Sequence, residues 1–139
     1  IGHVKRLGGR LAIVDKRRAS ATETKQENII GGPLDGRVAL MFDDMISTAG
    51  SICGAARLVQ EAGAREIHVA ATHGILCGPA LERIEEAPIT SVVLTDSVPV
   101  EGDRKIPQIQ ILTVAPLLAE AIKRIHHDQS ISAIFSNSV

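Results

Sequence analysis

The sequence predicts a three-layer α/β domain with a mainly parallel sheet and flanking helices. Short apolar runs rich in branched residues alternate with helical apolar patterns, which is typical of βαβ crossovers. The chain has 139 residues, 45% of them hydrophobic and 22% charged, which suits one soluble globular domain. No internal repeat or linker divides the chain, so we expect residues 1–139 to form a single domain.

Five apolar runs are predicted to be strands buried on both faces. Each is short and dominated by Ile, Val, Leu and Ala, as expected for a sheet in a chain with no Trp or Tyr. The runs are residues 10–15 (RLAIVD), 37–42 (RVALMF), 66–72 (EIHVAAT), 89–95 (ITSVVLT) and 109–114 (IQILTV).

Three helices are predicted between and after these strands. The first places Ile52, Ala55, Ala56, Val59 and Ala62 on one face. The second covers residues 78–87 and has Pro79 in its first turn. The third covers residues 115–127, and its predicted core face consists of Leu118, Ala121, Ile122 and Ile125.

Two segments interrupt this alternation. Residues 16–32 are too polar to pack and too long for an ordinary turn, so we expect a mobile functional loop. Residues 1–9 resemble the end of a helix that is closed by Gly8 and Gly9. We therefore expect the domain to be N-terminally truncated, with the chain starting inside a larger domain.

Composition argues against several functional classes. The net charge is −1, and the near absence of aromatic residues removes the stacking platforms that single-stranded nucleic acid needs, so we expect no nucleic acid partner. No apolar run is long enough to cross a bilayer, and we expect no membrane association. Cys53 and Cys77 are well separated, which favours neither a disulfide framework nor a metal site. A cytoplasmic location fits best.

The stretch DDMISTAGS (residues 43–51) contains the strongest chemical signal. It lies between a predicted strand and the N-terminus of a helix, where unpaired N–H groups attract an anion. Gly50 allows close approach to a phosphate, and hydroxyl residues add donors or cap the helix. Asp43 and Asp44 would be repelled by that phosphate and suit the hydroxyls of a sugar. A sugar phosphate is therefore predicted, although Asp and Ser are also ordinary turn and capping residues.

The chain resembles the C-terminal half of the ribose-phosphate pyrophosphokinases, whose fold is that of the type I phosphoribosyltransferases. The resemblance rests on MFDDMISTAGS, LAIVDKRR, ATHGILCGPALERI and LLAEAIKRIHHDQSISAIF, in the family's order. It implies transfer of a pyrophosphoryl group from Mg-ATP to ribose 5-phosphate, which yields AMP and phosphoribosyl pyrophosphate. It also implies a homo-oligomer.

The resemblance assigns roles to individual residues. Lys16 and Arg18 match the catalytic cations of a mobile flap, and Asp43 and Asp44 match the carboxylates that bind the ribose hydroxyls. The residues that match the loop for the 5-phosphate are Ser47, Thr48, Ala49, Gly50 and Ser51. The protein ligands for Mg²⁺ and most ATP contacts are expected upstream of Ile1, so no metal ligand is assigned within the chain.

One departure and the extent of the match leave alternatives open. Ser47 replaces an Asp that is common in pyrophosphokinases and suits a type I phosphoribosyltransferase. Because only half of the family's chain is matched, we expect this chain alone to lack activity. A non-catalytic regulatory or interaction module that pairs with full-length relatives is the other alternative.

Overall fold

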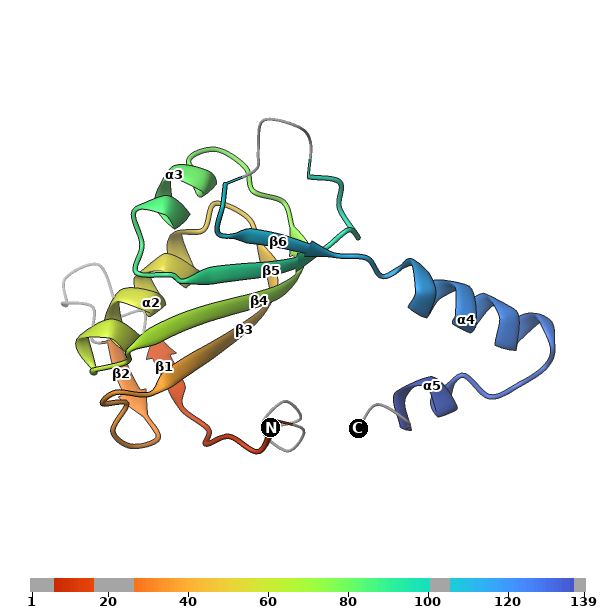
Figure 1. The fold of residues 1–139 in the computed structure, drawn as a ribbon, viewed down its shortest axis with the longest axis horizontal. Helices are drawn as coiled ribbons and strands as arrows, with labels where there is room; N and C mark the ends of the chain where they lie inside the picture. The colour runs from red at the N-terminus through yellow and green to blue at the C-terminus, as the bar shows by residue number, and fades with distance from the viewer. Residues whose placement is uncertain (1–6, 17–26, 101–105, 137–139) are drawn as a thin grey trace.

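The computed structural model describes residues 7–16, 27–100 and 106–136. At its centre is a parallel sheet with the strand order β3-β4-β5-β6 (Figure 1). The strands are β3 (Val38–Ile46), β4 (Glu66–Gly74), β5 (Ser91–Thr95) and β6 (Ile109–Leu112). Helices α2 (Gly50–Glu61) and α3 (Ala80–Glu85) form the crossovers between the first three strands, which confirms the predicted α/β class.

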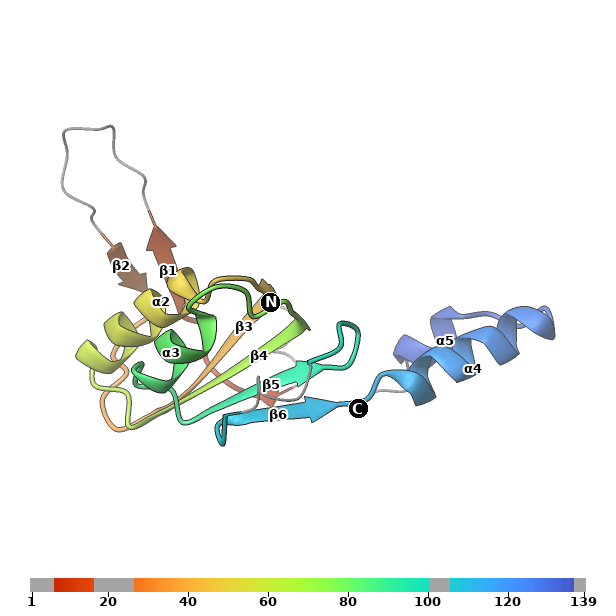
Figure 2. The same cartoon turned by 90° about the horizontal axis from the view of Figure 1, so that it is seen from above.

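The hydrophobic core lies between the sheet and these two helices, which lie on the same face of the sheet (Figure 2). Alternate residues of β4 and β5 point into it, including Ile67, Val69 and Val92. The α2 side of the core is formed by Ile52, Cys53, Ala56 and Val59, close to the predicted helical face.

The opposite face of the sheet is less covered than the sequence suggested. Val38, Leu40 and Phe42 of β3 are all exposed, with 52% exposure for Leu40. The expectation that this strand is buried on both faces is therefore wrong for the described structure. The apolar run does contain alternate partly buried residues, Ala39 and Met41, which pack against the core.

Residues 13–30 differ from the prediction in two ways. Strand β1 (Ile13–Lys16) does not join the parallel sheet but pairs antiparallel with β2 (Glu27–Ile30), as a separate two-stranded sheet. The predicted loop 16–32 thus contains a strand, which the polar composition of the segment concealed. Val14 and Ile29 pack against the main core, and residues 17–26 lie outside the described part of the chain.

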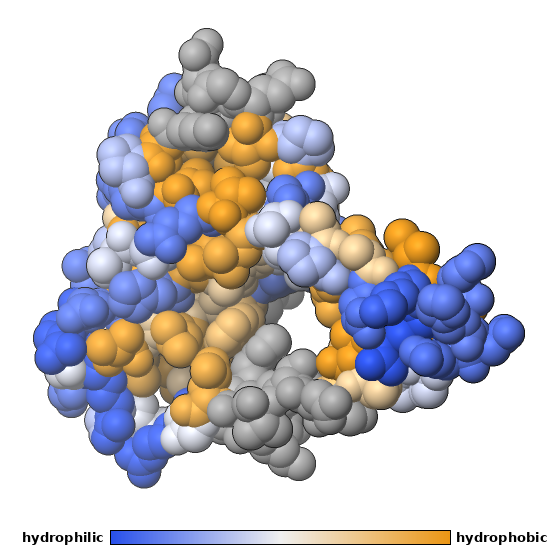
Figure 3. All heavy atoms as spheres, turned by 45° about the vertical axis from the view of Figure 1, so that its right-hand side comes forward, coloured by the Kyte–Doolittle hydropathy of each residue, from blue (hydrophilic) through white to orange (hydrophobic). Residues whose placement is uncertain are grey.

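Helix α4 (Ala115–His126) has the predicted bounds to within one residue, but its predicted core face is not buried. Leu118, Ile122 and Ile125 are exposed, because α4 and the short α5 (Ser132–Ser136) project away from the sheet (Figure 1). Apolar residues gather on the side of α4 and α5 that faces the rest of the molecule, and polar residues on the opposite side (Figure 3).

The predicted helix end at residues 1–9 lies mostly outside the described residues, although Gly8 has the left-handed φ of 67° that often ends a helix. None of the helices described is long and apolar enough to pass through a membrane.

Candidate functional site

The predicted sugar-phosphate stretch lies at the carboxyl end of β3. Strand β3 is longer than expected and continues through Asp43 and Asp44, and Asp43 pairs with Ala71 of β4. The two carboxylates therefore belong to the strand, not to the turn that follows it. Both are exposed, and the Asp44 N–H donates to Asp43 Oδ1 at 2.9 Å.

The turn after β3 leads into α2 through an unusual backbone conformation. Ala49 is the N-cap residue, with φ 59° and ψ 0°, and no side chain caps the helix. The sequence also allowed Ser47, Thr48 or Ser51 to cap the helix, and the structure does not show this. The first N–H groups of a helix have no partner within it, so this N-terminus keeps donors and a positive dipole end for an anion.

A cavity of about 120 Å³ brings most of the predicted binding residues together. Asp43 and the whole of residues 47–51 line it, whereas Asp44 does not. One carboxylate and the uncapped helix end thus border the same small, open cavity. This arrangement can bind an anion at the helix end and accept hydrogen bonds from hydroxyl groups at Asp43.

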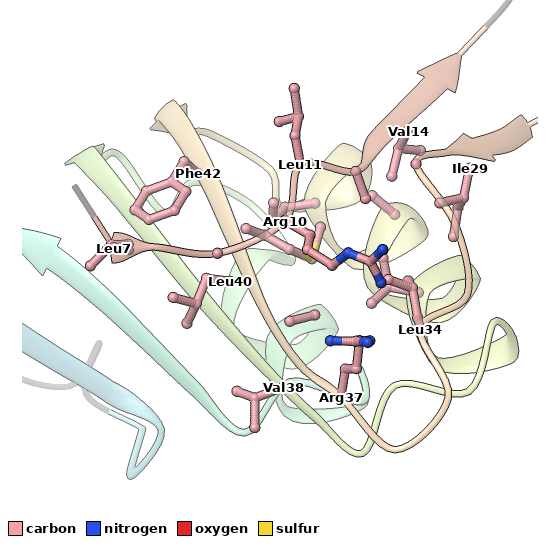
Figure 4. A pocket seen from close by; sticks show the side chains of 18 of the residues that line it. Leu7, Arg10, Leu11, Val14, Ile29, Leu34, Arg37, Val38, Leu40 and Phe42 are labelled. Carbon is pink, nitrogen blue, oxygen red and sulfur yellow. The ribbon is translucent and has the colours of Figure 1, made fainter. Parts of the chain in front are cut away.

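A larger cavity of about 820 Å³ adjoins the first, because Asp43 and Ser51 line both. It extends between α2, β3 and the β1–β2 hairpin, where Val14 and Ile29 contribute to its wall. Its lining is mainly apolar, but Arg10 also lies in it beside Arg37 (Figure 4).

The segment after β4 holds the turn through hydrogen bonds to its main chain. The Ile46 carbonyl accepts hydrogen bonds from the N–H groups of Ile75 (3.0 Å) and Leu76 (3.1 Å). Cys77 N–H donates to the Ser47 carbonyl at 3.0 Å, and its Sγ lies 3.2 Å from Ser47 Oγ. The sequence did not indicate this contact, since the two residues are 30 positions apart.

Helix α3 provides a second support, which the sequence also did not indicate. Arg83 Nη1 donates to the Thr48 carbonyl at 2.9 Å, and the Arg83 carbonyl accepts a hydrogen bond from Cys53 Sγ at 3.3 Å. Burial raises the pKa of the Cys53 thiol above its usual value, against the opposing effect of Arg57 and Arg83. Cys53 is therefore a protonated core residue.

The structure places the other predicted residues only in part. Lys16 is the last residue of β1, and Arg18 lies outside the described residues. His73 was not among the predicted site residues; it is exposed near the carboxyl end of β4, and its Nδ1 lies 2.8 Å from Ser97 Oγ. Among the side chains described, no group of three His, Cys, Asp or Glu could hold a metal ion.

The chain is similar to several known proteins. Residues 8–136 match the family described as "Phosphoribosyl synthetase-associated domain". A ribose-phosphate pyrophosphokinase from Rhodopirellula baltica is 71% identical over 97% of this chain, and one from Clostridium acetobutylicum is 45% identical over 97%. The chain spans only 43% and 44% of the lengths of these two relatives.

A solved structure is similar as well. The phosphoribosylpyrophosphate synthetase from Mycobacterium smegmatis superposes with a TM-score of 0.72 and 37% sequence identity. The match covers 76% of this chain and 35% of that protein.

Proposed function

The chain belongs to the ribose-phosphate pyrophosphokinase family, and we propose that it forms the ribose 5-phosphate site of such an enzyme. The observation that carries this proposal is the uncapped N-terminus of α2, which shares a cavity of about 120 Å³ with the Asp43 carboxylate. The names of the relatives favour this activity over the phosphoribosyltransferase alternative.

In this proposal, the two ends of the sugar phosphate use different chemistry. The 5-phosphate binds to the N–H groups and hydroxyls of residues 47–51, where the helix dipole favours a negative charge. The ribose hydroxyls donate hydrogen bonds to Asp43 and Asp44. A carboxylate next to the phosphate would repel it, so the separation of the two functions along the chain is physically required.

We further propose that Lys16 and Arg18 act on the phosphates that are transferred. The hairpin that begins with β1 borders the larger cavity, which shares Asp43 and Ser51 with the smaller one. Cations that contact the transferred phosphates would neutralise their charge, an effect worth roughly 10³ to 10⁵ in rate for arginine fingers. ATP would supply the pyrophosphoryl group.

Mg²⁺ is proposed as the cofactor because the family's reaction uses Mg-ATP. The described residues hold no three-ligand metal cluster, so they do not fit a resident metal ion. Mg²⁺ commonly binds through substrate phosphates and one or two carboxylates, and we propose that it arrives with ATP. A cytoplasmic location is proposed because Cys53 and Cys77 are both free thiols.

The direct test is a titration with ribose 5-phosphate, followed by calorimetry and by amide chemical shifts. We expect shifts at Gly50 and Ser51 that free ribose does not produce at equal concentration. Asp43→Asn should weaken binding about 10- to 100-fold, since a hydrogen bond to a charged group contributes about 1.5–3 kcal/mol. Thr48→Val provides a second variant that removes only one hydroxyl donor. Unchanged spectra at millimolar ribose 5-phosphate would contradict the proposal.

The exposed apolar surfaces support a second proposal, namely that the chain associates with other protein chains, most simply as a homo-oligomer. Strand β3 is an edge strand of the described sheet, and its outer face carries Val38 and Leu40. The α4 helix adds Ile122, which is 66% exposed. Large apolar patches mark interaction sites, and an unpaired strand edge can pair with another chain.

A further inference from the structure

We propose that Arg83 is a positioning residue for the phosphate-binding loop, which we define as residues 47–51. This inference rests on the proposed function, because it assigns Arg83 a role at that same site. Among the described cationic side chains, Arg83 is the one that donates a hydrogen bond to the loop, from Nη1 to the Thr48 carbonyl at 2.9 Å. It comes from α3, 35 residues further along the chain.

Helix α3 is held firmly enough for Arg83 to act as a support. Ile84, the next residue, is fully buried in the core beside α2. The Arg83 carbonyl also accepts the hydrogen bond from Cys53 Sγ, and Cys53 lies in the first turn of α2. Arg83 therefore contacts the loop with its side chain and the start of α2 with its main chain.

The hydrogen bond to Thr48 has a directional consequence for the loop. In a planar trans peptide, the carbonyl and the following N–H point in opposite directions. When Arg83 holds the Thr48 carbonyl, it also directs the Ala49 N–H away from α3. One loop donor is thus aimed by a side chain that need not touch the phosphate.

The loop needs such support because its backbone is strained. Ala49 has a φ of 59°, a conformation that non-glycine residues adopt only when their surroundings enforce it. Cys77 holds the Ser47 carbonyl on one side of this residue, and Arg83 holds the Thr48 carbonyl next to it. Gly50 leaves room for the Arg83 side chain, because a Cβ at this position would lie 3.3 Å from Arg83 Nη1.

The test compares Arg83→Met, Arg83→Lys and Arg57→Met in the whole chain. Arg57 is an exposed cation on α2, about two turns beyond Gly50, so Arg57→Met is a matched control for loss of positive charge. Circular dichroism would establish that each variant is folded. The readouts are ribose 5-phosphate affinity and the amide shifts of Ala49 and Gly50 without ligand.

We expect Arg83→Met to weaken ribose 5-phosphate binding about tenfold, which is the loss expected for one hydrogen bond to a charged group. Arg83→Lys should recover most of this loss, and Arg57→Met should bind like the unmodified chain. In Arg83→Met, the Ala49 and Gly50 amides should shift while those of β5 do not.

Two negative results have different meanings. If the unmodified chain does not bind ribose 5-phosphate, the proposed function fails, and the ligand-free loop shifts still decide whether Arg83 positions the loop. If the unmodified chain binds and Arg83→Met binds equally well with unchanged loop amides, the inference about Arg83 is overturned. If Arg83→Met does not fold, Arg83→Gln replaces it as the variant without the cation, and unchanged affinity and loop amides in Arg83→Gln would overturn the inference.

Discussion

Substitution of Gly by Ala should have opposite effects at two positions, one inside α2 and one in the turn that ends it. Gly63 follows the helix with φ 93°, and its N–H donates to the Gln60 carbonyl at 2.9 Å. The Ala64 N–H donates to the Val59 carbonyl at 3.2 Å, which completes a Schellman motif. Gly54 lies inside the helix, and a Cβ there would have no atom within 4 Å.

The expected magnitudes follow from these surroundings. Gly63→Ala forces a left-handed conformation, which costs roughly 1–2 kcal/mol. The new Cβ would also overlap Asp35 Oδ1 and lie 3.0 Å from the Asp35 Cα, a backbone atom. Such crowding adds about 1–3 kcal/mol, so the free energy of unfolding should fall by about 2–5 kcal/mol. Gly54→Ala should raise it by about 0.5–1 kcal/mol, because Gly destabilises a helix interior.

Urea unfolding followed by far-UV circular dichroism is the suitable assay, since the chain has no Trp or Tyr for fluorescence. The slope m should be the same for both variants and the unmodified chain, so that the midpoints report stability alone. A Gly63→Ala variant within about 0.5 kcal/mol of the unmodified chain would refute the strain argument. A destabilised Gly54→Ala variant would show that the added Cβ contacts other atoms on this surface of α2.

Two further predictions concern the rest of the fold. Hydrogen bonds from the Thr113 side chain and the Val114 N–H lower the pKa of Asp96. Its carboxylate therefore stabilises the native state above the unfolded-state pKa, and this contribution is lost as pH falls through the lower folded value. Asp96→Asn should unfold earlier than the unmodified chain at neutral pH, and a difference that persists in acid would contradict this. Leu40→Glu should lower the molar mass that light scattering measures toward that of the monomer. Gln60→Glu, at an exposed position of α2, should leave that mass unchanged. A monodisperse monomer of the unmodified chain would exclude self-association.

Local patterns predicted the helices and the parallel strands well, because periodicity depends on neighbouring residues. The apolar spacing of α2 anticipated its buried Ile52, Ala56 and Val59. The same reasoning ended β3 too early, since the carboxylates of Asp43 and Asp44 read as a turn. Pairing with β4 overrides the local preference of Asp for turns, and the sequence of β3 alone does not reveal this pairing.

The support of the loop could not be predicted, because it depends on contacts between distant parts of the chain. Cys77 and Arg83 reach Ser47 and Thr48 across 30 and 35 positions. Spacing likewise predicted an apolar face on α4 but could not show that the helix projects away from the sheet and leaves this face exposed. The hairpin partner β2 was missed because only four residues in a polar segment form it.

The β1–β2 hairpin is separate from the parallel sheet, so it can unfold locally while the parallel sheet stays folded. The hairpin forms its own two-stranded sheet and is anchored to the core through Val14 and Ile29. Two-stranded sheets are marginally stable, and local opening of such units needs less free energy than global unfolding. Amide hydrogens of β1 and β2 should therefore exchange with solvent much faster than those of β4. The strand that carries Lys16 can rearrange while the backbone around Gly50 keeps its native hydrogen bonds.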